Sequence, residues 1–582
     1  MKSYTLRKRL NENLLDDLLL ARGIEGEEAV KHFLTPDYER DSHDPFLFPD
    51  MDVAVERILL ARKNNEVVCV WSDYDCDGIP GGVMLTQFLR TLGLSVIHYI
   101  PHRHREGYGL NIEGIDSLKE QNVSLMITID LGTTEHERIA YAKTKGIDTI
   151  VTDHHVVQQK AKQVDMSIAQ GDGPSIANFE HEIMRANGDF VWPDALAFIN
   201  PKRPDSKYPF DGLSGAGVAW KLIQAILIKE RGNIPAGHEK WFLDLVGLST
   251  LSDMVPLVGE NRMLAKFGLT VMQRNRRPGL AALLKVLKIK PSGLTEDDIG
   301  FMISPRINAA SRMDSPDVAA KLLAATDEEE AHVLARQLNH INDERKGLVA
   351  ATVKEANHRL KEMGTEASVI VMGSTKWRPG ILGLVANKLA EAHQKPVFLW
   401  GREGGEVLRG SVRAGDEVSV VDIMTGAPEA FVHFGGHHAS GGFAVNEANV
   451  HELGAKLGAS YETLRAKGVE KQSTVLEREV ALSEVSHALR TLSNLAPFGV
   501  GNSKPLFLFP QVEVARMKMF GKASDHIEVS LAGNGASATG IAFFSTPDSF
   551  TKSLAAGTRA DIVGHIETDW RGGPRIRVVD VI

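Results

Sequence analysis

The chain has 582 residues, and at roughly 100–200 residues per domain this length predicts about three to five structural units. With 43% hydrophobic and 24% charged residues, its composition argues against a disordered, collagen-like or coiled-coil protein. The 66 Lys and Arg residues against 75 Asp and Glu residues make a net charge of −9, which excludes a uniformly basic binder of nucleic acid.

The cysteines and the lengths of the apolar runs indicate the cellular compartment of the protein. Cys69 and Cys76 do not form a C-x-x-C pair, so neither a disulfide framework nor a cysteine-based zinc site is expected. Asp16 and Asp17 interrupt the leucine-rich stretch near the N-terminus, and no run of 18 or more apolar residues occurs. We therefore expect a cytoplasmic protein that does not enter a membrane.

Residues 1–50 are polar and predicted to be helical, and a first α/β lobe is expected at residues 51–325. From Val53 to about Leu257, short β-rich runs alternate with helical patterns. This alternation indicates a parallel sheet with crossover helices, whose ligands bind beyond the carboxyl ends of the strands. The segment from Val156 to Trp192 lacks a sustained pattern and is expected to be a loop, to which we assign no function. The predicted strands are Glu66–Trp71, Ser95–Pro101, Leu125–Ile129 and Thr149–Thr152.

Residues 326–364 carry apolar side chains at helical spacing and are predicted to form one long helix that could bend at Gly347. A second α/β unit is expected at residues 365–446, followed by a linker helix at 447–472. Residues 473–582 hold short β-like runs separated by turn residues, which is typical of a small OB-like β-barrel. The expected fold class is thus α/β, with two α/β lobes joined by a long helix and a barrel after them.

Several aromatic residues of the predicted barrel admit two interpretations. Their rings could stack on the bases of a single strand, but packing in the barrel core is the default expectation for most of them. The residues are Phe520, Phe543, Phe544 and Trp570.

Three aspartates alternate directly after the first predicted strand, in the string SDYDCDG that begins at Ser72. Three carboxylates this close raise one another's pKa unless a cation compensates them. An EF-hand loop is rejected, because position twelve counted from Asp73 is Met84 rather than a glutamate and because the string follows a strand. Taken alone, the string indicates either a metal site or a solvated acidic turn that caps the next helix.

Three further polar clusters favour the metal site. Asp130 follows the third predicted strand, Asp153, His154 and His155 follow the fourth, and Asp253 stands in the string LSDMVP. A parallel topology can bring these strand ends to one edge of the sheet. Carboxylates with imidazoles and without thiolates suit Mn²⁺ or Mg²⁺, so we expect a two-metal centre for the hydrolysis of a phosphate ester.

The strings DYDCDG, TIDLG, VTDHH and LSTLSDMVPL resemble, in order and spacing, the four motifs of the DHH phosphoesterase superfamily. Further strings extend the resemblance over nearly the whole chain to the RecJ family, whose members are bacterial single-strand-specific 5′→3′ DNA exonucleases. The departures from the family pattern, among them Pro80 and Arg378, remove none of the implied metal ligands. The further strings are PHRHREGYGL, FDGLSGAGVAWKL, SPRINAASRMD, WRPGILGLVA, LRGSVRA, FGGHHASGGF and PFGVGN.

The resemblance implies roles for the matching residues. It implies two Mn²⁺ or Mg²⁺ ions bridged by Asp130, with Asp77 and His155 as catalytic groups close to the ions or the scissile phosphate, and with Asp153 orienting an imidazole. The metal ligands that it implies are Asp73, Asp75, Asp130, His154 and Asp253. The substrate-binding residues that it implies are Arg103, Arg306 and Arg312 in the first lobe and Ser411, Arg413, Gly435, Gly436 and His437 in the second lobe, called DHHA1.

The resemblance also implies a function, the degradation of single-stranded DNA to 5′-mononucleotides in DNA repair and recombination. It implies association with a single-strand DNA-binding protein and a repair helicase, and we expect a monomer. One alternative is a phosphodiesterase of the same superfamily that cleaves short oligonucleotides or cyclic dinucleotides, although the barrel favours long strands. Another is a non-catalytic repair scaffold, which has no need of such a charge cluster. For an exonuclease we expect Arg and Lys to cluster between the lobes.

Overall fold

The computed structural model describes residues 3–159, 184–364, 367–402, 407–415, 418–467, 473–521, 524–569 and 572–582. The chain divides into two compact units. The first, here called the barrel unit, consists of Met1–Ser42, Pro256–Lys266 and Lys471–Ile582. The second, here called the α/β unit, consists of His43–Val255 and Phe267–Glu470. The N-terminal residues thus belong with the C-terminal barrel, far from them in sequence.

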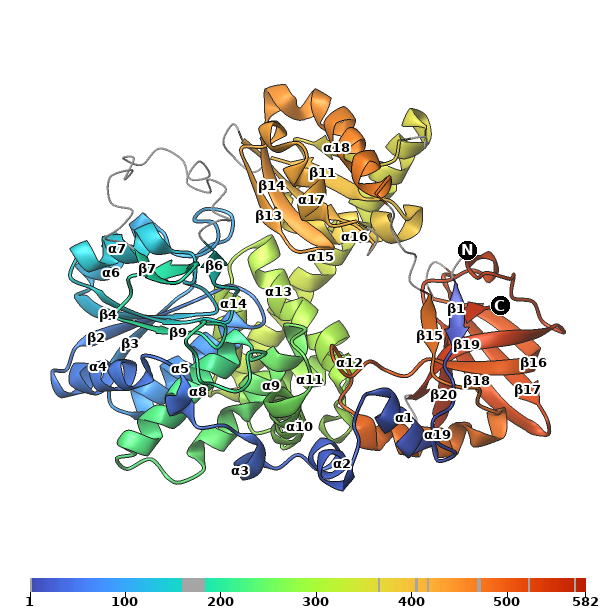
Figure 1. Ribbon diagram of the computed structural model, residues 1–582, viewed down its shortest axis with the longest axis horizontal. Coiled ribbons are helices and arrows are strands. Elements are labelled where there is room, and N and C mark those ends of the chain that lie inside the picture. The colour runs from blue at the N-terminus through green and yellow to red at the C-terminus, as the bar shows by residue number, and fades with distance from the viewer. Residues whose placement is uncertain are drawn as a thin grey trace. The chain divides into compact units, whose positions relative to one another are not determined.

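The first lobe of the α/β unit contains a parallel sheet of five strands in the order β3-β2-β4-β5-β9 (Figure 1). The four strands predicted from the sequence are confirmed. The fifth, β9, was not predicted because three residues are too few to show a pattern. The strands are β2 (Val67–Ser72), β3 (Ser95–Tyr99), β4 (Val123–Ile129), β5 (Asp148–Thr152) and β9 (Ala197–Ile199).

Helices flank this sheet and continue into a helical region. Pro80 lies in the first turn of α5 (Gly78–Thr91), where a backbone N–H has no partner within the helix, so this departure from the family pattern costs no helical hydrogen bond. The other helices of the sheet are α4 (Met51–Lys63), α6 (Ile112–Glu120), α7 (His136–Thr144) and α8 (Gly215–Lys229). Those of the helical region are α9 (Leu243–Ser252), α11 (Pro278–Leu287), α12 (Glu296–Asp298), α13 (Ser304–Met313), α14 (Asp317–Ala324) and α10 (Gly259–Gln273), whose residues up to Lys266 belong to the barrel unit.

The segment from Val156 to Trp192, expected to be a loop, differs from that expectation at both of its described ends. It contributes a small antiparallel sheet in the order β6-β8-β7. Strands of two to four residues are too short for a periodic pattern, which explains why the sequence did not predict them. Residues 160–183 lie outside the described residues. The strands are β6 (Gln158–Gln159), β7 (Met184–Asn187) and β8 (Phe190–Pro193).

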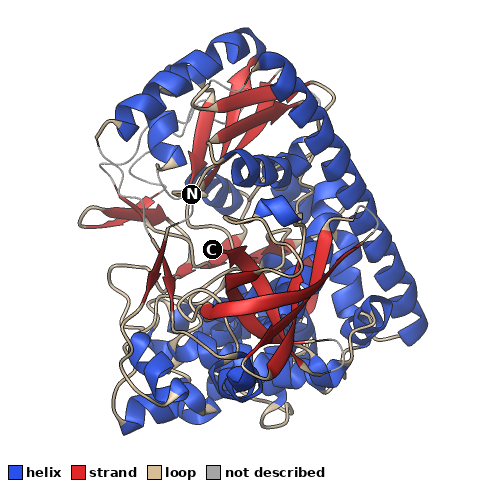
Figure 2. Ribbon diagram, turned by 90° about the vertical axis from the view of Figure 1, so that its right-hand side faces the viewer, coloured by secondary structure: helices blue, strands red, loops and turns tan. Residues whose placement is uncertain are grey.

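The predicted long helix is α15 (Glu328–Met363), which continues through Gly347 without interruption. It leads to a second sheet in the order β10-β11-β12-β14-β13, in which β10 and β11 are parallel and the other pairs antiparallel. Strands of this sheet, with helices beside them, are seen at the top of Figure 2. This lobe confirms the expected second α/β unit. Its strands are β10 (Ile370–Ser374), β11 (Val397–Gly401), β12 (Val407–Arg413), β13 (His433–Gly436) and β14 (Ser440–Asn446), and its helices are α16 (Pro379–His393), α17 (Val420–Thr425) and α18 (Val450–Arg465).

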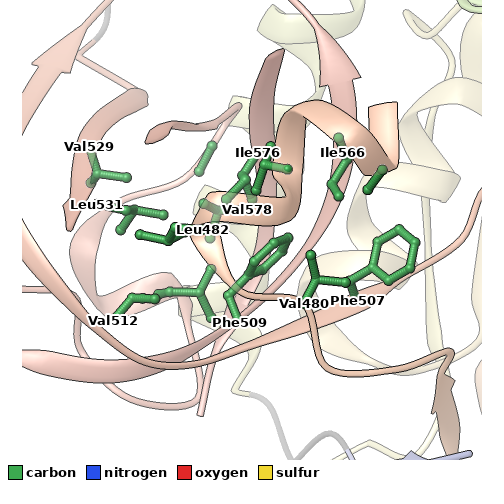
Figure 3. Packing of buried hydrophobic residues seen from close by; sticks show 14 of the residues in the cluster. Val480, Leu482, Phe507, Phe509, Val512, Val529, Leu531, Ile566, Ile576 and Val578 are labelled. Carbon is green, nitrogen blue, oxygen red and sulfur yellow. The ribbon is translucent and has the colours of Figure 1, made fainter. Parts of the chain in front are cut away.

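The barrel unit contains the expected closed barrel, with strand order β16-β17-β18-β20-β19. Its interior is filled by aliphatic and phenylalanine side chains, among them Phe507 and Phe509 (Figure 3). Leu18 and Leu19 of α1 (Leu14–Ala21) belong to the same core. The strands are β16 (Phe507–Phe520), β17 (His526–Gly533), β18 (Ala536–Ala542), β19 (Arg559–Thr568) and β20 (Pro574–Val581).

The remaining elements of the barrel unit anchor the N-terminal residues. Strand β1 (Tyr4–Leu6) pairs in parallel with β15 (Thr474–Leu476). The other helices are α2 (Glu27–Leu34), α3 (Tyr38–Asp41) and α19 (Val485–Leu495). Among the helices that the structure describes, none combines the length and apolarity needed to cross a membrane.

Candidate active site

The first lobe brings seven acidic and imidazole side chains to one edge of its parallel sheet. Asp73 directly follows β2, Asp130 follows β4, and His154 comes soon after β5. Asp253 joins them from the C-terminal end of α9. The seven form three overlapping groups, in each of which one ligand atom per residue lies within 4.8 Å of the others. These groups are Asp73, Asp75 and Asp130; Asp77, His154 and Asp253; and Asp130, His154 and His155.

His154 lies at the centre of the cluster. Its Nε2 atom is 3.1 Å from Oδ1 of Asp130, 3.5 Å from Oδ2 of Asp253 and 3.7 Å from Oδ2 of Asp77. The five residues for which the sequence implied a metal-ligand role are therefore close together. The two implied catalytic groups, Asp77 and His155, belong to the same cluster as the implied metal ligands.

The electrostatics of the cluster are unfavourable without a cation. Burial, followed by repulsion from neighbouring carboxylates, raises the pKa of Asp73 and Asp130 well above the ordinary value, and the same two causes raise the pKa of Asp253 to about 9. Among the described residues, three buried atoms of the cluster have no hydrogen-bond partner: Oδ1 of Asp73, Nδ1 of His154 and Oδ1 of Asp130, whose 3.1 Å contact with Nε2 of His154 is not a hydrogen bond. Oxygen and imidazole donors that are buried and unpaired fit one or more hard divalent cations.

The backbone at Asp130 is in the left-handed region, with φ of +62°. This conformation is uncommon for a residue with a side chain, although aspartate tolerates it better than most. The Asp130 N–H donates to the carbonyl oxygen of Thr152 at 3.0 Å, which fixes the turn after β4. Gly215 packs against it, since a Cβ atom at Gly215 would lie 2.5 Å from Cβ of Asp130. The local fold therefore holds this carboxylate in place at some conformational cost.

Asp77 has a structural role that its sequence position did not reveal. Its carboxylate accepts hydrogen bonds from the backbone N–H groups of Gly215, at 2.7 Å, and Ala216, at 2.8 Å, which begin α8. The hydroxyl of Ser249 on α9 also donates to Oδ1 of Asp77. Asp77 thus joins the first strand-end loop to two helices, and Ser249 is a supporting residue that the sequence analysis missed.

Asp153 supports the imidazoles. Burial alone would raise its pKa, but the neighbouring His155 outweighs burial and lowers it. Its Oδ1 atom is 2.7 Å from Nδ1 of His155 and accepts a hydrogen bond from the backbone N–H of His154, also at 2.7 Å. The N–H of Thr133 donates to Oδ2 at 2.9 Å. These contacts agree with the expectation that Asp153 orients an imidazole.

A cavity of about 660 Å³ opens between the two lobes of the α/β unit. From the first lobe, Tyr74, Arg103 and Tyr108 line it, and the Arg103 guanidinium lies 4.8 Å above the Tyr74 ring. Tyr74 stands between two of the clustered aspartates in sequence, and the Tyr108 hydroxyl donates to the carbonyl oxygen of Asp130 at 3.4 Å. The cavity therefore adjoins the acidic cluster.

The second lobe lines the cavity with Arg409, Ser411 and His433. Sequence analysis implied a substrate role for Ser411 but missed Arg409, His433 and, in the first lobe, Tyr108. The sequence did hold a signal for Arg409. Residues two apart on a strand share a face, and Arg409 stands two residues before Ser411 on β12.

The other implied substrate residues lie in different surroundings. Arg413 ends β12, and Nη1 of Arg312 donates to the carbonyl oxygen of Gly380, a cavity residue, at 3.2 Å. Arg306 instead directs Nε to Oδ1 of Asn339 at 3.0 Å and Nη1 to the carbonyl oxygen of Met302. Gly435 and Gly436, which end β13, and His437, in the turn that leads to β14, are not among the residues that line the cavity.

The barrel has an aromatic group on its surface. Phe544 is 81% exposed and Phe543 is 40% exposed, so Phe544 is not a core residue. The His526 ring lies between them, with ring centroids 4.8 Å and 5.6 Å away, and Phe520 is 5.1 Å from the same ring. Trp570 lies outside the described residues. Of the two interpretations, stacking on bases suits Phe544 better than core packing.

Comparisons with known proteins agree with this architecture. Two family models match the chain, the DHH family, N-terminal domain, over residues 67–250 and the RecJ OB domain over residues 476–579. The single-stranded-DNA-specific exonuclease RecJ of Bacillus subtilis is 29% identical over 576 residues, covering 97% of this chain and 67% of the relative. The protein of the same name from Escherichia coli is 27% identical over 553 residues, covering 91% of this chain and 89% of the relative.

A solved structure shares the whole fold. The crystal structure of RecJ in complex with Mn²⁺ from Thermus thermophilus matches with a TM-score of 0.76 and 25% identity, over 100% of this chain and 79% of that one. A crystal structure of exonuclease RecJ bound to manganese matches with a TM-score of 0.56 and 29% identity, over 71% of this chain and 94% of that one.

Proposed function

This chain belongs to the RecJ family of DHH phosphoesterases, and from that premise we propose that it is a metal-dependent exonuclease that degrades single-stranded DNA. The observation that carries the proposal is the cluster of seven acidic and imidazole side chains beside a cavity between two lobes. Its unpaired buried oxygens and nitrogen are what a site for divalent cations requires.

We propose that two Mn²⁺ or Mg²⁺ ions bind this cluster. The ligands would be Asp73, Asp75, Asp130, His154 and Asp253, and the family resemblance implies that Asp130, which belongs to two of the three groups, would be shared between the ions. When bound, such ions activate a water molecule for attack on phosphorus and stabilise the leaving oxygen. Asp77 and His155 would hold the scissile phosphate and the ligands in position.

The chain's own residues would bind and orient the strand. Arg103 and Ser411, on opposite sides of the cavity, can donate to phosphate oxygens, and Arg413 and Arg312 add planar donor groups nearby. For Arg306 and for Gly435, Gly436 and His437, a substrate role rests on the family resemblance. The barrel would bind a further part of the strand, with exposed Phe544 as a stacking surface.

We propose that attack starts at the 5′ end and releases 5′-mononucleotides, as part of DNA repair and recombination. The finer assignments belong to the same proposal: action as a monomer in the cytoplasm, together with a single-strand DNA-binding protein and a repair helicase. The domain division we propose is the N-terminal segment at 1–50, the DHH domain at 51–325, the connecting helix at 326–364, the DHHA1 domain at 365–446, the linker helix at 447–472 and the barrel at 473–582.

The test uses oligonucleotides labelled at either end. Wild-type protein with Mn²⁺ should release a labelled mononucleotide first from a 5′-labelled single strand, leave a matching duplex intact, and turn over a dinucleotide more slowly than a long strand. Asp130→Ala should abolish turnover, whereas Asp52→Ala, on the exposed side of α4, should not. Activity in EDTA, or undiminished activity of Asp130→Ala, would overturn the mechanism. Faster turnover of the dinucleotide would indicate a short-oligonucleotide phosphodiesterase instead.

A further inference from the structure

Four arginines gather where the two lobes of the α/β unit meet, and they form what we call the arginine cluster. Burial, followed by repulsion from the other three guanidinium groups, lowers the pKa of Arg312 to about 10. Guanidinium groups keep their charge under physiological conditions, so the cluster concentrates positive charge. Its members are Arg103, Arg312, Arg345 and Arg413.

Within the described part of the chain, none of the four members of the cluster forms an ion pair with a carboxylate. Asp73 interacts electrostatically with Arg103, but it belongs to the acidic cluster. Elsewhere in the same unit, Arg203 pairs with Asp205 at 2.8 Å and Arg277 with Asp244 at 2.6 Å, and the buried Arg306 has two neutral oxygens as partners. Because guanidinium groups that lack carboxylate partners repel one another, the arginine cluster is suited to an anionic ligand that supplies the missing charge.

The position of the cluster beside the cavity identifies the kind of ligand. Arg103 lines the cavity, and Arg312 is bonded on both sides to residues that also line it. Nη1 of Arg312 donates to the carbonyl oxygen of Gly380, and the carbonyl oxygen of Arg312 is 3.1 Å from Nε2 of His104. An anion held here would lie close to the acidic cluster, as the phosphates flanking a scissile bond must.

Arg345, on α15, is the member of the arginine cluster that neither the motifs nor the family resemblance suggested. Its Nε atom is buried and has no hydrogen-bond partner among the described residues. Asn342, three residues earlier and so on the same face of the helix, is fully buried, and neither polar atom of its side chain has a partner there either. By contrast, Arg306 is already bonded to Asn339 and Met302. Arg345 and Asn342 therefore offer unsatisfied polar groups on one face of α15.

We propose that Arg345 binds a backbone phosphate of the DNA strand, acting with the other three members of the arginine cluster. This proposal rests on the proposed exonuclease function and adds a residue of the connecting helix to the substrate site. A phosphodiester oxygen pair matches the planar donor fork of a guanidinium group, and several such groups around one phosphate explain why the cluster tolerates its own repulsion. Asn342 would complete the site through its amide.

The test compares Arg345→Gln with Arg336→Gln, which removes the same charge from an exposed position on the same helix. The probe is a fluorescent single-stranded oligonucleotide with phosphorothioate linkages at its 5′ end, in Mn²⁺, and anisotropy measures its affinity from 50 to 200 mM salt. Arg345→Gln should weaken binding about 10-fold and reduce the slope of log affinity against log salt by about 0.7, the share of one phosphate contact with a single strand. Arg336→Gln should change neither quantity.

Three results would overturn the inference: Arg345→Gln binding like Arg336→Gln, weaker binding without a change in the salt slope, or a loss of Mn²⁺ affinity, which would indicate a purely structural role. Arg345→Lys keeps the charge without the planar fork, so it should restore the salt slope and only part of the affinity. Failure of the wild-type protein to bind or cleave the unmodified strand would instead contradict the proposed function.

Discussion

Nδ1 of His155 lies 2.7 Å from Oδ1 of Asp153, and this contact determines how the imidazole can act. A carboxylate only accepts hydrogen bonds, so Nδ1 must carry a proton and Nε2 is the atom left to face the acidic cluster. Burial alone would lower the pKa of His155, but the Asp153 carboxylate outweighs burial and raises that pKa to about 9. Asp153 is therefore a positioning residue for the site.

Asp153→Asn should reduce kcat about 10- to 100-fold, the usual effect of losing a carboxylate that orients an imidazole at a metal site. The amide can donate as well as accept, so it no longer selects one tautomer of His155. The measurement is steady-state cleavage of a single strand together with a Mn²⁺ titration. Asp52→Asn, which removes a carboxylate that is 61% exposed, is the control and should leave kcat unchanged. An unaltered kcat in Asp153→Asn would show that His155 needs no orientation.

Asp130→Asn should have opposite effects on the stability and on the activity of the protein. Asparagine tolerates the left-handed backbone at this position, so the variant should fold. In EDTA its Tm should exceed that of the wild type, because one of several mutually repelling buried carboxylates is gone. Mn²⁺ at about 100 times its Kd should stabilise the wild type by about 2.7 kcal/mol and the variant by much less.

The comparison needs thermal unfolding of both proteins with and without Mn²⁺, together with their exonuclease activity. The variant should be inactive. An equal Mn²⁺-induced rise in Tm for both proteins would mean that Asp130 is not a metal ligand. A lower Tm of the variant in EDTA would mean that the cluster is not repulsive.

Much of this arrangement could be predicted from sequence, because it depends on local signals. The four longer strands of the first sheet are apolar runs, and the acidic residues stand where those runs end, so parallel topology alone brings Asp73 and Asp130 to one edge. Strand β9 and the hairpin of β7 and β8 escaped prediction because they hold only three or four residues each.

What could not be predicted depends on contacts between segments distant in sequence. Asp77 accepts from Gly215 across 138 residues, and nothing in its own motif reveals that it caps a helix. Arg345 lies on a helix rich in exposed charged residues, where charge alone does not distinguish it from Arg336. Its lack of a partner becomes visible only when α13, α15 and the second lobe are assembled.

Ser249→Ala should destabilise the α/β unit. The Ser249 hydroxyl donates to the buried carboxylate of Asp77, and a hydrogen bond to a charged group contributes about 2 kcal/mol. Tm should therefore fall by several degrees, with a smaller effect on cleavage, because the N–H groups of Gly215 and Ala216 still hold Asp77. Thr250→Val is the control, since that hydroxyl bonds to the carbonyl oxygen of Val246 within the same helix. Equal Tm shifts in the two variants would contradict a special role for Ser249.

Glu135 should make stability depend on pH. It is only 9% exposed, and burial raises the pKa of its carboxyl from 4.5 to about 7. A raised folded-state pKa means that the folded protein favours the protonated acid. The stability that Glu135 contributes is present below pH 4.5, declines as the pH rises through about 7, and is absent above it, a loss of about 3 kcal/mol at 1.36 kcal/mol per pKa unit.

Glu135→Gln stays neutral at every pH, so its Tm should match that of the wild type near pH 5 and exceed it at pH 8. Measuring both proteins across this range cancels the other titrating groups. A difference between Glu135→Gln and wild type that is the same at pH 5 and pH 8 would show that Glu135 is ionised throughout.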